Sequence, residues 1–387
     1  MRTGHPGTTI ACVAAAWLLV HRAAAQSVVH VHTPETLQGP HAGCNIIPAD
    51  LPLGAAAPRF DPAAWTIITP RSAPAFTIVI DDPANLLAPH TAAIQSNLSA
   101  ACARWAQVLD APAGPVTITV LVQVNNTYPR ATGRSAATAY TGSTGGLDIY
   151  EQGAAYEVRT GVDPNGITHD AIITLNSAYV SDELWFDPDP AARTAPVPNN
   201  RTDAVSVFLH ELGHVLAFNG WRDNLNGALP GNYASPFDLD TFFDGDFVFE
   251  GVLASSAYGA PVPLTFGNAK HVGNNPPRPG SDLIPDLMNG LLFYRGVRYD
   301  ITPLDLNISQ DCGVTLAGGG GGCDTIDFNR DELFPDTQDI DDFLSVFSGG
   351  ACPTGSCGDV DFNNDGLFPD TLDIDALLSV FSGGACV

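Results

Sequence analysis

Two histidines and a glutamate stand close together in the stretch HELGHVLAFNGW, residues 210 to 221. On a helix, His210 and His214 would lie one turn apart on the same face, with Glu211 next to the first of them. Two imidazoles at this spacing can bind a zinc ion, and the glutamate can act as a general base towards water. The motif therefore predicts a hydrolytic zinc site with ligands His210 and His214 and base Glu211.

A catalytic zinc ion usually has three protein ligands, so a third must come from another part of the chain. Many zinc proteases that begin this way carry it six residues after the second histidine, where this chain has Gly220. His271 is the only histidine beyond the motif. We expect it to be the third ligand, because imidazole is the usual partner in such sites. Asp223 and Glu250 are the alternatives.

Met288 is the only methionine besides the initiator, and it lies 17 residues after His271 in the turn-like stretch DLIPDLMNG. A lone methionine most often fills space in a hydrophobic core. Its position soon after a candidate ligand is typical instead of the Met-turn that forms the floor of one class of zinc protease sites.

The segments that must position these residues have the order of an α+β domain. The spacing of apolar residues predicts strands over 75–80, 115–124 and 170–180 and a helix over 88–109. A second helix over 201–218 carries the zinc motif, with Thr202 or Asp203 as its N-cap. Most other residues of this helix are apolar, so we expect it to be buried, where unpaired histidines and glutamates are unfavourable.

The N-terminus has the pattern of a secretory signal peptide over 1–25: a basic Arg2, an apolar stretch over 10–20 and a small-residue cleavage site. Residues 26–75 form an irregular lead-in rich in proline, alanine and glycine. No later segment reaches the ~18 apolar residues of a membrane-spanning helix. The net charge of -26 argues against nucleic acid as a partner. A secreted or cell-surface protein is expected.

The C-terminal region consists of two copies of one unit, 323–352 and 357–386, offset by 34 residues and preceded by a glycine linker over 317–322. Oxygen-bearing side chains recur in each copy at the alternating positions of a calcium loop, and an apolar helical stretch follows. The expected ligands, with the two leucines contributing their carbonyl oxygens, are Asp327, Asn329, Asp331, Leu333, Asp336 and Asp339, and then Asp361, Asn363, Asp365, Leu367, Asp370 and Asp373.

The stretch 202–313 resembles a metzincin of the leishmanolysin-like kind. In that family an insertion displaces the third histidine, an LM-containing Met-turn follows it, and a closing helix similar to 301–314 comes last. The resemblance implies a zinc protease domain over 76–316, built of a twisted sheet and an active-site helix. It implies ligands His210, His214 and His271, base Glu211 and Met-turn residue Met288, acting on protein or peptide substrates.

Residues 323–387 resemble a dockerin of the form whose repeats end in Gly-Gly-Ala-Cys. The resemblance implies a small all-α module that binds two Ca²⁺ ions and docks to a cohesin-like partner or surface scaffold. In so small a domain we expect the disulfides Cys323–Cys352 and Cys357–Cys386 to add stability. Cys44 either pairs with Cys102 or caps the zinc ion as an inhibitory thiolate, and no role is assigned to Cys312.

These features together predict a secreted zinc endopeptidase in which zinc activates water, Glu211 accepts its proton, and the repeats dock the enzyme to a scaffold. Tyr294 and Tyr299 follow the Met-turn and could stabilise an oxyanion, although packing is the commoner role of a tyrosine. Two other functions are alternatives: a non-catalytic adhesion or scaffold protein with a relic zinc site, and a zinc hydrolase of cell-wall amides.

Overall fold

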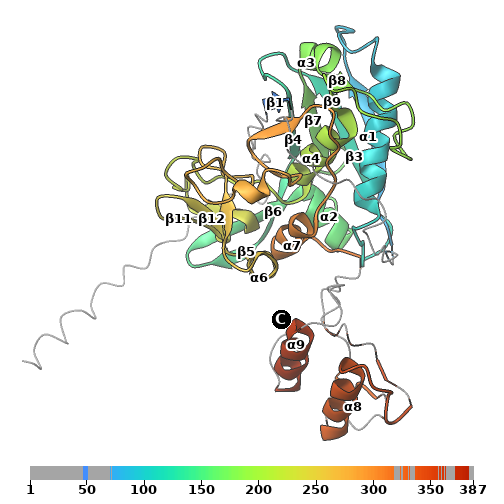
Figure 1. Cartoon of the computed structure of the whole chain (residues 1–387), viewed down its shortest axis with the longest axis vertical. Coiled ribbons are helices and arrows are strands. Elements are labelled where there is room, and N and C mark those ends of the chain that lie inside the picture. The colour runs from blue at the N-terminus through green and yellow to red at the C-terminus, as the bar shows by residue number, and fades with distance from the viewer. Residues whose placement is uncertain are drawn as a thin grey trace, which may run out of the picture. The chain divides into compact units, whose positions relative to one another are not determined.

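The computed structural model describes residues 47–50, 70, 72–317 and parts of 323–382, where the gaps are 324–325, 330, 332–335, 356, 359, 361 and 363–370. The expected signal peptide, most of the lead-in and most of the glycine linker lie outside these residues. Helices and strands of the described part are intermixed along the chain, so the α+β class expected from the sequence is confirmed (Figure 1).

The central sheet has the strand order β2-β3-β7-β4, with β2 Ala75–Asp81, β3 Thr117–Val124, β7 Ala171–Leu175 and β4 Ala131–Ser135. The first three are parallel and β4 runs antiparallel to β7. Of the strand expected over 170–180, only the first half is present, as β7. It stops because the Asn176 side chain accepts hydrogen bonds from two backbone amides and begins a helix instead, α3 Ser177–Asp182.

Two long helices pack beside this sheet, α1 Thr91–Ala106 and α4 Ala204–Leu216 (Figure 1). The buried indole of Trp105 donates a hydrogen bond of 3.0 Å to the carbonyl oxygen of Leu209, which joins α1 to the middle of α4. Both helices fall within the ranges expected from their apolar spacing. Among the described residues, no helix is long and apolar enough to cross a membrane.

The other elements surround α4 and the end of the sheet. Their bounds are β1 Ile47–Ala49, β5 Thr138–Thr144, β6 Leu147–Gln152, α2 Gly153–Thr160, β8 Leu184–Trp185, β9 Thr202–Asp203, β10 Tyr233–Ala234, α5 Pro236–Leu239, β11 Thr241–Phe243, β12 Phe247–Phe249, α6 Val252–Tyr258, β13 Val262–Leu264, a 3₁₀ turn Ser281–Leu283, β14 Leu292–Tyr294 and α7 Pro303–Asp311.

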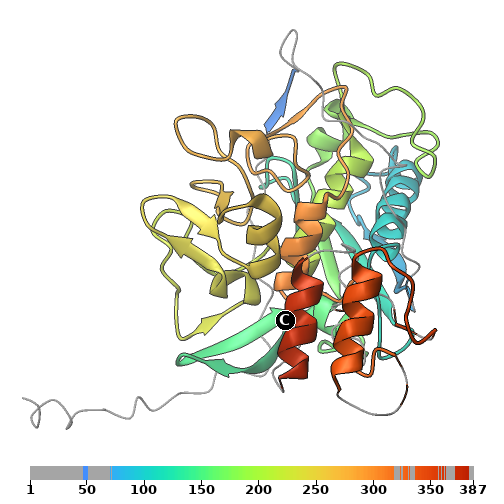
Figure 2. The same ribbon diagram turned by 60° about the horizontal axis from the view of Figure 1, so that its bottom comes forward.

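The segment between α4 and His271 forms a small unit around the three-stranded sheet β11-β12-β13. Figures 1 and 2 both show this sheet on the opposite side of α4 from α1. Phe237, Phe247 and Phe249 are almost fully buried and pack into the same core as α4. The segment between α4 and His271 therefore shares one core with α4, and it returns the chain to α4 at His271.

The repeats form helices α8 Thr337–Phe347 and α9 Thr371–Phe381, with a core of their own. Phe343 of the first repeat packs between Phe328 of the same repeat and Phe362 of the second. Its ring centroid lies 5.2 Å from that of Phe328 and 6.1 Å from that of Phe362. Two similar units thus bury one shared apolar face.

The disulfide predictions were wrong. Cys352 bonds to Cys357, with their Cα atoms 5.8 Å apart, so neither Cys323–Cys352 nor Cys357–Cys386 forms. The reason is local: the end of the first repeat turns back within five residues, which brings these two cysteines together. Cys323 is also disulfide-bonded. Cys102 is a buried free thiol, which excludes the Cys44–Cys102 bridge, and Cys312 is another.

Candidate metal centre

The zinc motif lies on α4, and every residue of that helix is buried. Asp203 is the N-cap, as one of the two expected candidates, and its carboxylate accepts from the Ser206 amide at 3.0 Å. At the other end Ala217 has a φ of -142°, so the helix stops without a residue in the left-handed conformation. The helix therefore holds His210, Glu211 and His214 on a rigid, buried support.

His271 reaches the same place from the end of the insertion. Its backbone carbonyl accepts from Thr265, and the next residue, Val272, donates its amide to the carbonyl of Met288 at 2.9 Å. The His214 Nε2 atom lies 3.0 Å from that of His210 and 2.9 Å from that of His271. All three histidines are at most 1% exposed.

The alternative third ligands lie elsewhere. Asp223 is exposed, and its carboxylate accepts from the amides of Leu225 and Asn226 within a local turn. Glu250 is also exposed, just past the end of β12. Neither belongs to the group of side chains around His210 that could share a metal ion.

Each imidazole is oriented by a hydrogen bond from its other ring nitrogen. The Nδ1 atoms of His210, His214 and His271 lie 2.7, 2.7 and 3.1 Å from the backbone carbonyl oxygens of Leu287, Phe218 and Asn268. A carbonyl only accepts, so each Nδ1 carries a proton and each Nε2 presents a lone pair. Three lone pairs that face one another in a buried space fit a cation bound between them, and zinc suits such a nitrogen donor set.

Burial keeps the three imidazoles in the neutral form that binds metal. It lowers the pKa of His214 to about 4, and it lowers the pKa values of His210 and His271 well below their ordinary value, helped by the neighbouring histidines. Protons therefore do not compete for the ring nitrogens near neutral pH.

Met288 lies directly beneath α4. A Cβ atom added at Gly213 would come within 2.6 Å of the Met288 sulfur, so the helix backbone and the thioether are in close contact between the two helix ligands. Met288 is fully buried, and its amide donates to the Asp286 carboxylate at 2.9 Å. Met288 therefore packs against the segment of α4 that carries His210 and His214.

Glu211 and His210 line a cavity of about 10 Å³, about enough for one water molecule. Two further polar side chains at this cavity were not anticipated from the sequence: Arg130, which precedes β4, and Tyr179 of α3. No local pattern marks either residue, and Tyr179 lies in the segment that was expected to be a strand.

Of the two tyrosines that follow Met288, Tyr299 has a packing role. Tyr299 is 2% exposed, its ring stacks on Phe293 at 4.1 Å between centroids, and its hydroxyl accepts from the Tyr294 amide. Tyr299 therefore packs beneath the site and holds the turn rather than facing a substrate. Phe293 is the residue of this segment that touches the centre, at 5.5 Å from the His210 ring.

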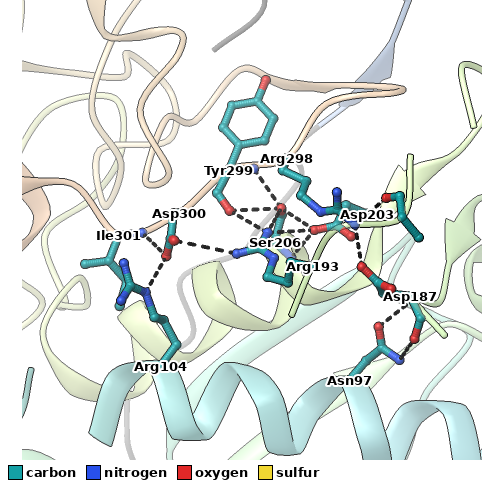
Figure 3. Close-up of polar contacts among 11 residues, drawn as sticks. Asn97, Arg104, Asp187, Arg193, Asp203, Ser206, Arg298, Tyr299, Asp300 and Ile301 are labelled. Atoms are coloured by element: carbon teal, nitrogen blue, oxygen red, sulfur yellow. Dashed lines mark hydrogen bonds and ion pairs between the residues drawn. The ribbon is translucent and has the colours of Figure 1, made fainter. Parts of the chain in front are cut away.

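A buried polar network fixes the start of α4 (Figure 3). The Arg193 guanidinium donates to the Asp203 carboxylate at 2.9 Å, to Ser206 at 3.1 Å and to the Tyr299 carbonyl at 2.9 Å. Asp300 lies on the other side of Arg193, at 3.7 Å. The network ties the N-terminus of α4 to the segment that follows β14.

The expected calcium ligands are only partly described. Leu333, Asp361, Asn363, Asp365, Leu367 and Asp370 lie outside the described residues. In the first loop the Asp331 amide donates to both Asp327 and Asn329, and the Asn329 amide donates to the buried Asp339. Within the described part of the chain, the loop carboxylates do not form a group close enough to share one metal ion. Asp373, the matching residue of the second loop, is also buried.

Comparison with protein-family models, with curated proteins and with solved structures finds no match to this chain.

Proposed function

We propose that this chain is a zinc-dependent endopeptidase, with the zinc ion held by His210, His214 and His271. The observation that supports this best is the convergence of three Nε2 atoms in a fully buried space, each with its ring orientation fixed by a backbone carbonyl. Three imidazole nitrogens directed at one buried point are a donor set that suits a zinc ion.

The neighbouring side chains have roles suited to hydrolysis. Bound zinc supplies a Lewis acid that acidifies a water molecule and polarises a carbonyl group. The Glu211 carboxylate, at the water-sized cavity, accepts the proton of the attacking water and later releases it to the leaving nitrogen. Arg130 and Tyr179 line the same cavity and have donor groups suited to stabilising the oxyanion.

The packing of β4 against α4 holds the Glu211 backbone in place. A Cβ atom at Gly133 of β4 would come within 2.0 Å of the Glu211 carbonyl oxygen, so only a glycine fits between this strand and the helix. Every residue of β4 is buried.

Metal content and peptide hydrolysis in a set of variants test the proposal. His271→Ala should lose most bound zinc and activity, whereas Asp223→Asn and Glu250→Gln, which remove the alternative ligands, should keep both. If His271→Ala retains zinc and turns over peptides normally, the third ligand is a different residue and the proposed centre is wrong.

We also propose that residues 323–387 bind two calcium ions and dock the enzyme to a protein scaffold. The two matching loops and the shared core of the repeats support this, and several carboxylates in one short loop repel one another without a cation. Since this segment has its own core, the isolated module can be tested.

Thermal unfolding of the isolated module should occur at a higher temperature in calcium than in chelator, because calcium binds only the folded form. Asp339→Asn should remove most of that increase, while Asp375→Asn, an exposed acid outside the proposed ligands, should not. Identical unfolding curves in calcium and chelator would exclude these loops as calcium sites.

A further inference from the structure

A second group of acidic side chains lies apart from both the histidine centre and the repeats. Glu157 of α2, Asp163 of the following loop and Asp170, which directly precedes β7, place one oxygen each within 4.8 Å of the others. Glu157 and Asp170 are 7% and 4% exposed, whereas Asp163 is exposed. Buried carboxylates in contact are rare unless a proton or a cation lies between them.

The loop between these elements is folded around its own polar groups. The Asp163 carboxylate accepts from the amides of Asn165 and Gly166 at 2.8 and 2.7 Å. The Asn165 side-chain nitrogen donates to the carbonyl oxygens of Thr168 and His169 and to the Asp170 carboxylate, each at 3.0 Å. These acceptors fix the orientation of the Asn165 side-chain amide. Its nitrogen is used by them, and its oxygen is the atom that remains to accept a hydrogen bond or bind an ion.

Basic residues do not neutralise this group. No ion pair among the described residues joins Glu157, Asp163 or Asp170 to an arginine, lysine or histidine. The nearest arginine along α2, Arg159, pairs with Glu151 instead. Three carboxylates thus share a small volume without a protein counter-ion.

Two buried oxygen atoms of the group accept no hydrogen bond. They are Oε2 of Glu157, whose residue is more than nine-tenths buried, and Oδ1 of Asn165. Buried acceptors in native proteins nearly always have a partner, and such exceptions often mark the place of a bound ion or water. The Glu157 and Asp170 carboxyl groups lie close enough to share a proton, so either a proton or a cation between them would supply the partner of Glu157. The buried Asn165 oxygen is the observation that points to a missing ligand.

We propose that Glu157, Asp163, Asp170 and the side-chain oxygen of Asn165 hold one divalent cation, and that this cation is calcium. The donors are all oxygens from carboxylates and an amide in an irregular loop, the set and geometry that calcium accepts, while zinc prefers nitrogen and sulfur. The ion would join α2 to the first residues of β7, the strand beside β4. It is a site on the catalytic domain, separate from the repeats.

A proton is the competing occupant. Burial, together with Asp170 and Asp163, raises the pKa of Glu157 to about 8, and burial raises the pKa of Asp170. Without a cation, Glu157 therefore carries a proton near neutral pH. Calcium would displace that proton, so binding should strengthen as the pH rises through this range.

The number of calcium ions bound by the zinc-loaded full-length chain tests the site, measured by equilibrium dialysis with calcium chloride at pH 8. Glu157→Gln keeps the shape of the protonated side chain and should bind one ion fewer than the wild type. The repeats contribute equally in both proteins. Asp182→Asn, at an exposed acid outside the group, should bind the same number as the wild type.

Asp163→Asn provides a second variant that leaves the buried part of the site intact, because Asp163 is exposed. It should weaken calcium binding at this one site at least about tenfold, since affinity follows the number of charged ligands. Calcium should also slow proteolytic cleavage within residues 161–169 of the wild type and not of Glu157→Gln. The proposal is wrong if both variants bind as many calcium ions as the wild type and bind them as tightly. In that case a shared proton occupies the group.

Discussion

Replacing Arg193 by methionine should strongly destabilise the domain that contains α4. The Arg193 side chain is 7% exposed and Asp203, the N-cap of the zinc helix, is fully buried, so the substitution leaves an uncompensated buried carboxylate. Removing one partner of a buried ion pair costs about 3–5 kcal/mol. We expect this loss in the free energy of unfolding, measured in urea on metal-free protein.

The surface pair of Arg278 with Asp246 provides a matched control. Its side chains are 35% and 38% exposed, so Arg278→Met should cost less than about 1 kcal/mol. A double variant, Arg193→Met with Asp203→Asn, should recover at least half of the lost stability, because asparagine still caps the helix without a buried charge. The reasoning fails if Arg193→Met is no worse than Arg278→Met, or if the double variant recovers nothing.

Three further substitutions test the site and its support. Glu211→Gln should keep its zinc but lower peptide turnover by about 10²–10⁴-fold, and a normal rate would exclude Glu211 as the base. Gly213→Ala should cost about 1–3 kcal/mol, because the new methyl group would lie 2.6 Å from the Met288 sulfur, and unchanged urea unfolding would contradict this contact. Burial and the nearby Asp286 carboxylate raise the pKa of Asp305 well above its ordinary value, so the native chain retains a proton that the unfolded chain loses above about pH 4. Asp305 therefore contributes stability that is lost as the pH rises from there, opposite in sign to the contribution of the three buried histidines. Asp305→Asn, whose amide replaces the proton, should make stability at pH 8 relative to pH 4 higher than in the wild type; an unchanged difference would contradict the raised pKa of Asp305.

Where local pattern dominates, the elements could be predicted from the sequence. The apolar spacing of 201–218 predicted the zinc helix, and Asp203 caps it because its side chain bonds to an amide three residues ahead. The strands that become β2 and β3 were also predicted correctly. The strand expected over 170–180 failed at Asn176, whose side chain begins α3. The local hydrogen bonds of this one polar side chain outweighed the apolar pattern around it.

Cysteine pairing could not be predicted in the same way. The two repeats suggested that each closes on itself, but Cys352 bonds to Cys357 across the short connection between them. Pairing depends on which sulfur atoms the folded chain brings together, and sequence spacing alone allows several arrangements.

The sequence by itself determined which candidate residues share one helix face: the grouping of His210, Glu211 and His214 depends on periods of three and four residues, which any helix imposes. Only the tertiary structure decided which distant groups join that helix. It brought His271 to within 2.9 Å of His214, placed Arg130 and Tyr179 at the cavity of Glu211, and gathered Glu157 with Asp163 and Asp170. Each of these meetings depends on how a long loop or insertion packs, and that packing follows from burial of the whole core rather than from any neighbouring residues.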